Sequence, residues 1–271
     1  MRDRSAGTGG GAGLIAWLIV CYTFLYAPIG FLIVFSFNDS RLVTGWSGFS
    51  TRWYAVLWHD RELIDATLLS LRIASVSASI ACVVGAAAGF ALARYGRFRG
   101  RGLFEAMLAA PLVMPEVITG LSLLLFFVTL EQLTGWPEGR GAGTVTLAHA
   151  SVSVAYVAVV VRARLADAGV ALEQAAMDLY APPWRAFVAI TLPLMAPALV
   201  SGWLLAFTLS MDDVVVASFT SGPGASTLPM VVFSATRLGV TPEIYALATA
   251  IVAVVAMLLL AVSLLWRRRR I

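Results

Sequence analysis

The chain has 271 residues, of which 60% are hydrophobic and 13% are charged, and its mean hydropathy is +0.87. A typical soluble domain is about half apolar and about a quarter charged, so this composition excludes a soluble globular protein. All 19 basic residues are arginine. The lack of lysine excludes a P-loop, whose lysine must reach the phosphates of a bound nucleotide.

Six apolar runs are long enough to cross a bilayer, which takes about 20 mostly apolar residues per helix. They cover residues 14–37, 66–93, 103–130, 145–161, 190–216 and 244–266. We therefore predict an all-α, polytopic membrane protein in which residues 1–271 form a single transmembrane domain. The first run lacks a short apolar core with a small-residue cleavage site, so we expect a retained helix. The glycine-rich stretch before it follows no strand and predicts a flexible tail.

The arginines divide unequally between the two ends of these spans. Short cytoplasmic loops retain Lys and Arg during insertion, so the richer side predicts the cytoplasm and places both termini there. The richer side holds Arg2, Arg4, Arg94, Arg97, Arg99, Arg101, Arg162, Arg164, Arg185 and Arg267 to Arg270. The other side holds Arg41, Arg52, Arg61, Arg140 and Arg237.

An aromatic cluster follows the first span on the predicted outer side. It consists of Trp46, Phe49, Trp53, Tyr54 and Trp58. Amphipathic rings settle at the membrane interface, so this cluster predicts a short interfacial helix. Cys21 and Cys82 lie inside apolar runs, where they fit small core residues rather than a disulfide or metal site.

Acidic side chains within the predicted spans are the first candidates for a functional site. Glu116 follows Pro111 and Pro115 on the third span, and prolines at these places open the helix and expose backbone groups to a cavity. Asp212 and Asp213 stand toward the outer end of the fifth span. An ionised carboxylate inside a span costs several kcal/mol by insertion scales, so such acids are usually functional.

Adjacent side chains on a helix diverge by about 100°, so we expect that Asp212 and Asp213 cannot both face one narrow pore. Polar stripes run along two spans: His149, Ser153 and Tyr156 on the fourth, and Ser201, Thr208 and Asp212 on the fifth. Such stripes also serve as contacts between helices, and this alternative stays open for the uncharged members.

Carboxylates along a wet path suit a cationic solute, and the rings of Trp203 and Phe207 could add cation–π attraction. The predicted substrate path comprises Glu116, Tyr156, Trp203, Phe207, Thr208, Asp212 and Asp213. An internal echo relates PLVMPEVITG at residues 111–120 to PLMAPALVSG at residues 193–202. It predicts either two broken helices that line a path or two proline-kinked helix entries.

The longest predicted cytoplasmic loop, residues 164–189, contains a short amphipathic helix at residues 173–179. Glu173, Ala176 and Tyr180 recur at helical spacing, and Pro182 and Pro183 end the helix. A short helix held away from the bilayer can act as a rigid peg for a partner. An ordinary amphipathic connector is the alternative.

This loop resembles the EAA signature of ABC-importer permeases, E-A-A-x-x-x-G followed by I-x-L-P. Ala175, Ala176, Ile190, Leu192 and Pro193 stand in register, whereas Gln174 occupies the glutamate position and Tyr180 the glycine position. The resemblance implies a coupling helix that docks in a cleft of an ATPase subunit. The implied coupling residues are Glu173, Gln174, Ala175, Ala176, Asp178 and Tyr180.

The two departures from the signature have physical consequences. Glycine at the position of Tyr180 often takes a positive φ, which tyrosine adopts poorly. Either this turn keeps a negative φ or the loop is strained. Gln174 keeps hydrogen-bonding capacity without charge, so Glu173 is a candidate to replace the missing carboxylate.

A closer resemblance, over most of the chain, is to the permeases of putrescine and spermidine importers, especially the second permease of a putrescine importer. The segments that carry it include SFN from Ser36, RFRG from Arg97, MPEVITGLSLLL from Met114, SGWLLAFTLSMDD from Ser201 and PEIYALAT from Pro242. In that family an aspartate stands at the position of Glu116, so the charge is kept on a longer arm.

The resemblance implies a type I ABC importer subunit in the bacterial inner membrane. Its implied partners are a second, homologous permease, two ATPase subunits that bind ATP and Mg, and a periplasmic polyamine-binding protein. No cofactor or metal is expected in this chain. Two other functions stay open: the same architecture for a different solute, and a secondary carrier that works alone. His59 and His149 supply neither a metal pair nor a triad, which argues against an intramembrane enzyme.

Overall fold

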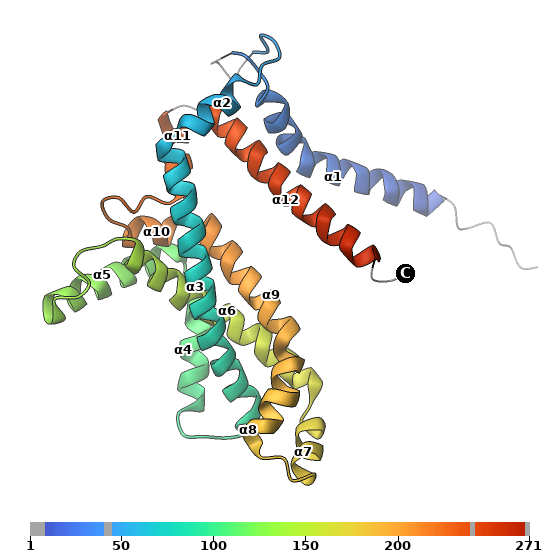
Figure 1. The fold of residues 1–271 in the computed structure, drawn as a ribbon, viewed down its shortest axis with the longest axis vertical. Helices are drawn as coiled ribbons and strands as arrows, with labels where there is room; N and C mark the ends of the chain where they lie inside the picture. The colour runs from blue at the N-terminus through green and yellow to red at the C-terminus, as the bar shows by residue number, and fades with distance from the viewer. Residues whose placement is uncertain (1–8, 41–44, 239–241, 269–271) are drawn as a thin grey trace, which may run out of the picture. The chain divides into compact units, whose positions relative to one another are not determined.

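The computed structural model describes residues 9–40, 45–238 and 242–268, and every regular element within these ranges is a helix. The predicted orientation residues Arg2, Arg4, Arg41, Arg269 and Arg270, and Gly7 of the predicted tail, lie outside the described ranges. The elements, labelled in Figure 1, are α1 (Gly9–Phe35), α2 (Arg52–His59), α3 (Arg61–Arg94), α4 (Arg101–Val113), α5 (Glu116–Thr134), α6 (Ala142–Ala168), α7 (Ala171–Asp178), α8 (Pro183–Ala186), the π-helical turn η1 (Phe187–Thr191), α9 (Leu192–Asp212), α10 (Val215–Thr220), α11 (Leu228–Leu238) and α12 (Pro242–Arg268).

Five of the described helices are long and apolar enough to cross a membrane: Gly13–Phe35, Arg61–Arg94, Glu116–Thr134, Ala142–Ala168 and Pro183–Asp212. The shorter apolar helix Pro242–Met257 lies within α12. These correspond to the six predicted spans, so the all-α polytopic prediction is confirmed.

The prediction of one continuous helix for the third span, residues 103–130, is wrong. α4 ends at Val113 and α5 begins at Glu116, with extended backbone at Met114 (ψ 137°) and Pro115 (ψ 137°). Proline has no amide hydrogen and disfavours helical backbone at the residue before it, which explains why the break falls at Met114.

The chain forms two compact units, Met1–Ile64 with Ser234–Ile271 and Asp65–Phe233. In the first unit α12 packs against α1 and α2. The predicted interfacial helix is α2, where the buried Trp53 donates its indole N–H to the Asn38 carbonyl oxygen at 2.7 Å. Tyr54 is also tied inward, because its hydroxyl lies 2.7 Å from Ser36 Oγ.

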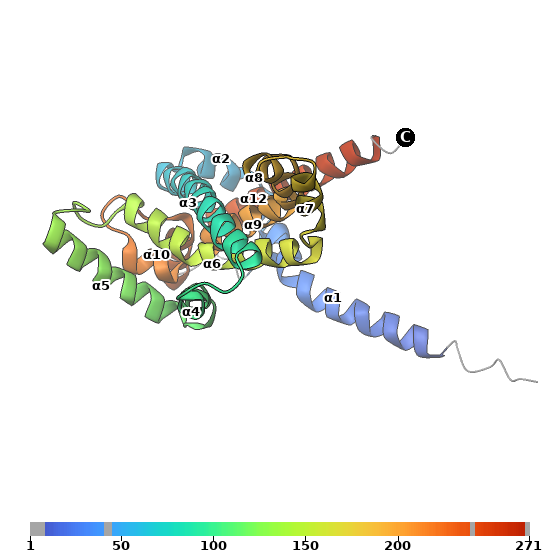
Figure 2. The same ribbon diagram turned by 90° about the horizontal axis from the view of Figure 1, so that it is seen from below.

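The core of the second unit is the packing of α6 against α3 and α9, as Figures 1 and 2 show. Small residues on α3 allow a close approach: a Cβ added at Gly85 would lie 2.7 Å from Val157 Cβ, and one added at Gly89 would lie 2.6 Å from the Ala158 carbonyl oxygen. Small residues of this kind let membrane helices approach closely and gain van der Waals contact. α3 and α6 are therefore in close contact in the core of the second unit.

Candidate functional site

The candidate site lies where two helices of the second unit are interrupted. α5 begins at Glu116 directly after the break at Pro115, so Glu116 occupies its first turn, where the helix dipole favours an acidic side chain. α9 ends at Asp212, and Asp213 has extended backbone (φ −71°, ψ 119°) before α10 begins at Val215. Both breaks direct acidic side chains toward α6.

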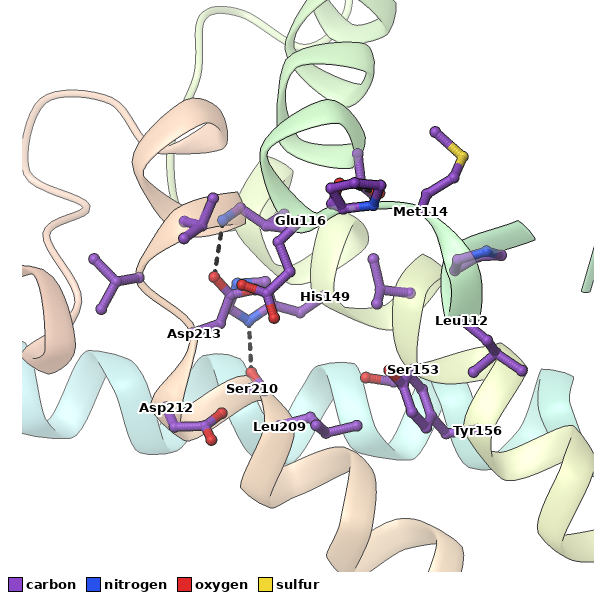
Figure 3. Close-up of a pocket in the computed structure, with 17 residues that line it drawn as sticks. Leu112, Met114, Glu116, His149, Ser153, Tyr156, Leu209, Ser210, Asp212 and Asp213 are labelled. Atoms are coloured by element: carbon purple, nitrogen blue, oxygen red, sulfur yellow. Dashed lines mark hydrogen bonds and ion pairs between the residues drawn. The ribbon is translucent and has the colours of Figure 1, made fainter. Parts of the chain in front are cut away.

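A cavity of about 460 Å³ lies between these breaks and α6. Its polar lining consists of Glu116, Thr119, His149, Ser153, Tyr156, Ser210, Asp212 and Asp213. Figure 3 shows the Glu116 carboxylate directed toward Asp213 and His149, with Asp212 at the end of α9. The structure thus brings together four of the predicted path residues: Glu116, Tyr156, Asp212 and Asp213.

The expectation that Asp212 and Asp213 cannot both face one narrow pore assumed a helix through both residues. α9 instead ends between them, and both line the wider cavity. Asp213 Oδ1 accepts hydrogen bonds from the backbone amides of Val216 at 2.8 Å and Ala217 at 3.4 Å, which caps α10. Its Oδ2 lies 3.7 Å from His149 Nε2. One carboxylate therefore fixes a helix start with one oxygen and faces α6 with the other.

His149 is one of four polar cavity residues that the predicted path omitted, together with Thr119, Ser153 and Ser210. Its side chain is only 1% exposed, and Nδ1 lies 2.7 Å from Ser210 Oγ, which in turn accepts a hydrogen bond from Ser77 at 3.2 Å. Nε2 has no hydrogen-bond partner among the described residues. The signal in the sequence was the stripe that His149 shares with Ser153 and Tyr156, since all of them line the cavity.

The remaining predicted path residues do not line this cavity. Trp203 donates its indole N–H to Ser79 Oγ at 3.1 Å and stacks on Phe207, with ring centroids 5.3 Å apart. Thr208 donates to the Leu204 carbonyl oxygen at 2.8 Å within its own helix. Their place in a solute path stays a prediction.

The echo between residues 111–120 and 193–202 does not produce two broken helices. The first copy is interrupted at Met114 and Pro115, but α9 continues through Pro197. The second copy follows the wide turn η1, in which the backbone is π-helical before α9 begins. The second copy, residues 193–202, therefore fits the alternative of a proline-containing helix entry better than that of a broken helix.

The predicted coupling helix is present as α7, Ala171–Asp178, which lies with α8 at the same end of the second unit as the α3–α4 connection (Figure 1). Glu173 accepts hydrogen bonds from Arg94 Nε and Nη2 at 2.9 to 3.0 Å and from the Thr191 hydroxyl at 2.9 Å. Arg94 also donates to the carbonyl oxygens of Leu165 at 3.0 Å and Gly169 at 2.7 Å. Glu173 thus holds α7 against the bundle, which leaves the exposed Gln174 and Asp178 to face outward.

Tyr180 adopts the strained alternative, with a φ of 61°. Its amide donates to the Met177 carbonyl oxygen at 2.9 Å and the next amide, of Ala181, donates to the Ala176 carbonyl oxygen at 3.1 Å. This pair of bonds is a Schellman motif, which normally carries glycine at the position of Tyr180. The tyrosine side chain is 97% exposed, so nothing within the described chain holds the ring.

Comparison with known proteins identifies the family of the chain. Residues 83–270 match the family described as "Binding-protein-dependent transport system inner membrane component". The chain is 56% identical over 241 residues to the "Putrescine transport system permease protein PotI" of Escherichia coli (strain K12), covering 89% of this chain and 86% of that protein. It is 41% identical over 255 residues to the "Spermidine/putrescine transport system permease protein PotC" of Haemophilus influenzae, covering 94% and 96%.

The fold is also similar to a solved structure, described as a "bacterial ABC transporter involved in the import of the acidic polysaccharide alginate". The TM-score is 0.73 at 15% identity, with 98% of each chain covered. The family match covers most of the chain, and the curated relatives match almost their full length. The chain is therefore a multi-pass membrane protein that belongs to the family of binding-protein-dependent transport system inner membrane components.

Proposed function

We propose that this chain is the permease subunit of an ATP-driven importer for polyamines, with putrescine as the first candidate, and that the cavity is part of the solute path. The observation that carries the proposal is the convergence of Glu116, Asp212 and Asp213 on one cavity inside a membrane protein. Carboxylates that face such a cavity stabilise an ammonium group by charge-assisted hydrogen bonds. The names of the two polyamine permeases to which the chain is similar support the same solute class.

The importer is proposed to contain a second, homologous permease, two ATPase subunits and a periplasmic binding protein that delivers the polyamine. This chain lacks lysine and hence the P-loop lysine, so ATP and Mg are assigned to the ATPase subunits. Both termini and the coupling segment, residues 164–189, are assigned to the cytoplasmic side of the bacterial inner membrane, in line with the arginine bias.

The mechanism follows from the tether between α7 and the bundle. Closure of the ATPase subunits moves α7, and the Arg94–Glu173 contact passes the displacement to α3, α6 and η1. α6 lines the cavity and η1 leads directly into α9, whose last residues also line it, so the exchange between outward-facing and inward-facing states is a population shift driven by nucleotide. The chain itself breaks no bond in the solute.

Reconstitution of the full importer in proteoliposomes tests the proposal. Uptake of labelled putrescine is measured for the wild type and for Glu116→Gln, Asp212→Asn and Asp213→Asn, with Glu138→Gln as a control because Glu138 does not line the cavity. Loss of one charged hydrogen bond is expected to lower uptake about tenfold to a hundredfold, while the ATPase subunits still co-purify.

Unchanged putrescine uptake in all three variants would refute the acidic path. Absence of putrescine uptake by the wild-type importer would favour the same architecture with another solute. Uptake that continues without ATPase subunits, and that collapses when an uncoupler is added, would instead show a secondary carrier.

A further inference from the structure

The arginines at the connection between α3 and α4 are of two kinds: some are held by other groups of the chain, and some have no partner among the described residues. Arg94 is occupied by Glu173 and by two backbone carbonyl oxygens. Arg101 donates to the carbonyl oxygens of Leu92 at 3.0 Å, Tyr95 at 2.9 Å and Gly96 at 2.6 Å. These bonds fix the loop, whereas Arg97 and Arg99 are exposed and make no hydrogen bond or ion pair with any described residue.

A groove of about 590 Å³ opens beside this loop. It is lined by Ala91, Arg94, Tyr95, Gly96, Arg97, Phe98 and Phe104. A second groove of about 450 Å³ shares Ala91 and Tyr95 with the first and runs along α3 and α9. Apart from the Tyr95 hydroxyl, its lining side chains are apolar: Val83, Ala86, Ala87, Phe90, Ala91, Phe187, Leu192, Met195 and Leu199.

Because the two grooves share Ala91 and Tyr95, we treat them as one track, which has Arg97 in the lining of its first part and apolar side chains along the rest. From Tyr95 back to Val83 the track follows α3 for about 18 Å at 1.5 Å per residue. One leaflet of a bilayer contributes about 15 Å of hydrocarbon, half of the usual core of about 30 Å. The track therefore has the length of an acyl chain.

We propose that this track binds an anionic phospholipid, with one acyl chain along α3 and its phosphate on Arg97, which lines the first groove, and on Arg99, two residues further along the same loop. Guanidinium groups bind phosphate oxygens in a bidentate manner, and two that lack a partner on a loop held by Arg101 are arranged for this before the lipid arrives. A soluble phosphate compound would use the arginines but not the apolar track. The site is independent of the solute that the importer carries.

Thermal unfolding of the purified full chain in detergent tests the site, with added dioleoyl phosphatidylglycerol as the probe. Phosphatidylcholine with the same acyl chains and inorganic phosphate are the comparison ligands. We expect saturable stabilisation by phosphatidylglycerol, a weak effect of phosphatidylcholine and none of inorganic phosphate. Each surface arginine contributes about 1 kcal/mol of attraction to anionic lipid, so Arg97→Gln with Arg99→Gln should raise the half-saturating concentration about thirtyfold.

Two further variants separate the parts of the site. Ala87→Phe fills the exposed part of the track and should also weaken phosphatidylglycerol binding, although both arginines remain. Arg61→Gln is the matched control, because Arg61 begins the same helix and lies outside both grooves. Both substituted arginines are exposed and lack partners in the described chain, so the double variant should unfold at the temperature of the wild type when no lipid is added.

Three results would overturn the proposal. The first is wild-type binding of phosphatidylglycerol by the double arginine variant. The second is equal stabilisation by inorganic phosphate with no effect of Ala87→Phe, which would indicate a soluble phosphate ligand. The third is a double variant that keeps its lipid but no longer co-purifies with the ATPase subunits, which would show that these arginines face a protein.

Discussion

Arg94 Nη2 lies 2.9 Å from Glu173 Oε1, and this ion pair joins the last residue of α3 to the first turn of α7. The side chains are only 9% and 16% exposed. Glu173 therefore serves as an internal tether, and the idea that its charge replaces the missing glutamate at position 174 in docking is not favoured by this geometry.

Removal of one partner of this pair should destabilise the loop and uncouple transport. Glu173→Gln and Arg94→Gln each leave a poorly solvated charge without its partner, which costs about 2 to 3 kcal/mol. The double variant should cost less than the sum of the two, because the interaction can be lost only once. Thermal unfolding measures the stability, and uptake per ATP hydrolysed measures the coupling. Gln174→Ala, at an exposed position, is the control, and strictly additive losses would contradict a direct tether.

Replacement of Tyr180 by glycine should relieve backbone strain. A left-handed conformation costs a non-glycine residue about 1 kcal/mol, so Tyr180→Gly should stabilise α7 by about that amount. Tyr180→Ala removes the same ring but keeps the strain, so it separates the two effects. Unfolding of the full chain reports stability, and co-purification with the ATPase reports docking. If glycine and alanine stabilise equally, the strain argument fails.

Asp213 is expected to have two separable roles. Asn at position 213 keeps an oxygen that can cap α10 but loses the charge, so Asp213→Asn should fold normally and transport poorly. Asp213→Ala should also lose about 1 kcal/mol of stability, because the amides of Val216 and Ala217 lose their acceptor. Uptake and unfolding measured on the same samples distinguish these outcomes. A fully active Asp213→Asn variant would confine Asp213 to a structural role.

Replacement of the α3 glycines that contact α6 by residues with larger side chains should destabilise the protein. At Gly89 a Cβ would lie 2.6 Å from the Ala158 carbonyl oxygen, so Gly89→Val should destabilise the protein by about 1 to 3 kcal/mol. Gly143→Ala on α6 is the control, since no atom lies within 4 Å of its added Cβ. That substitution should be neutral or slightly stabilising because alanine favours helix. Equal effects of the two changes in thermal unfolding would exclude the packing explanation.

The sequence predicted the parts of this structure that depend on local chemistry. Pro115 marked the break between α4 and α5, and Glu116 lines the cavity that the acidic residues predicted. Pro182 and Pro183 marked a boundary after α7, although they start α8 and α7 already ends at Asp178. Because tyrosine replaces glycine at position 180, the sequence predicted either a negative φ or a strained turn. The structure was needed to show that φ is positive.

Long-range relationships could not be predicted from one sequence. The Arg94–Glu173 pair joins residues 79 positions apart, and the His149–Ser210 contact joins residues 61 apart. The end of α9 at Asp212 had only Asp213 as a local signal, because no proline or glycine follows it before Ser221. After the end of α9, the Asp213 side chain accepts a hydrogen bond from the Val216 amide and so caps the start of α10.

The wide turn η1 sets the direction in which α9 presents its side chains. A π turn takes up one residue more than an α turn, so everything beyond Thr191 is rotated by about 100° relative to an unbroken helix that starts at Pro183. Removal of one residue from this turn would therefore swing Asp212 around the axis of α9 and out of line with Glu116, with α7 still in place. The extra residue of η1 thus sets the rotation of α9 about its own axis, and this rotation directs Asp212 toward the break between α4 and α5.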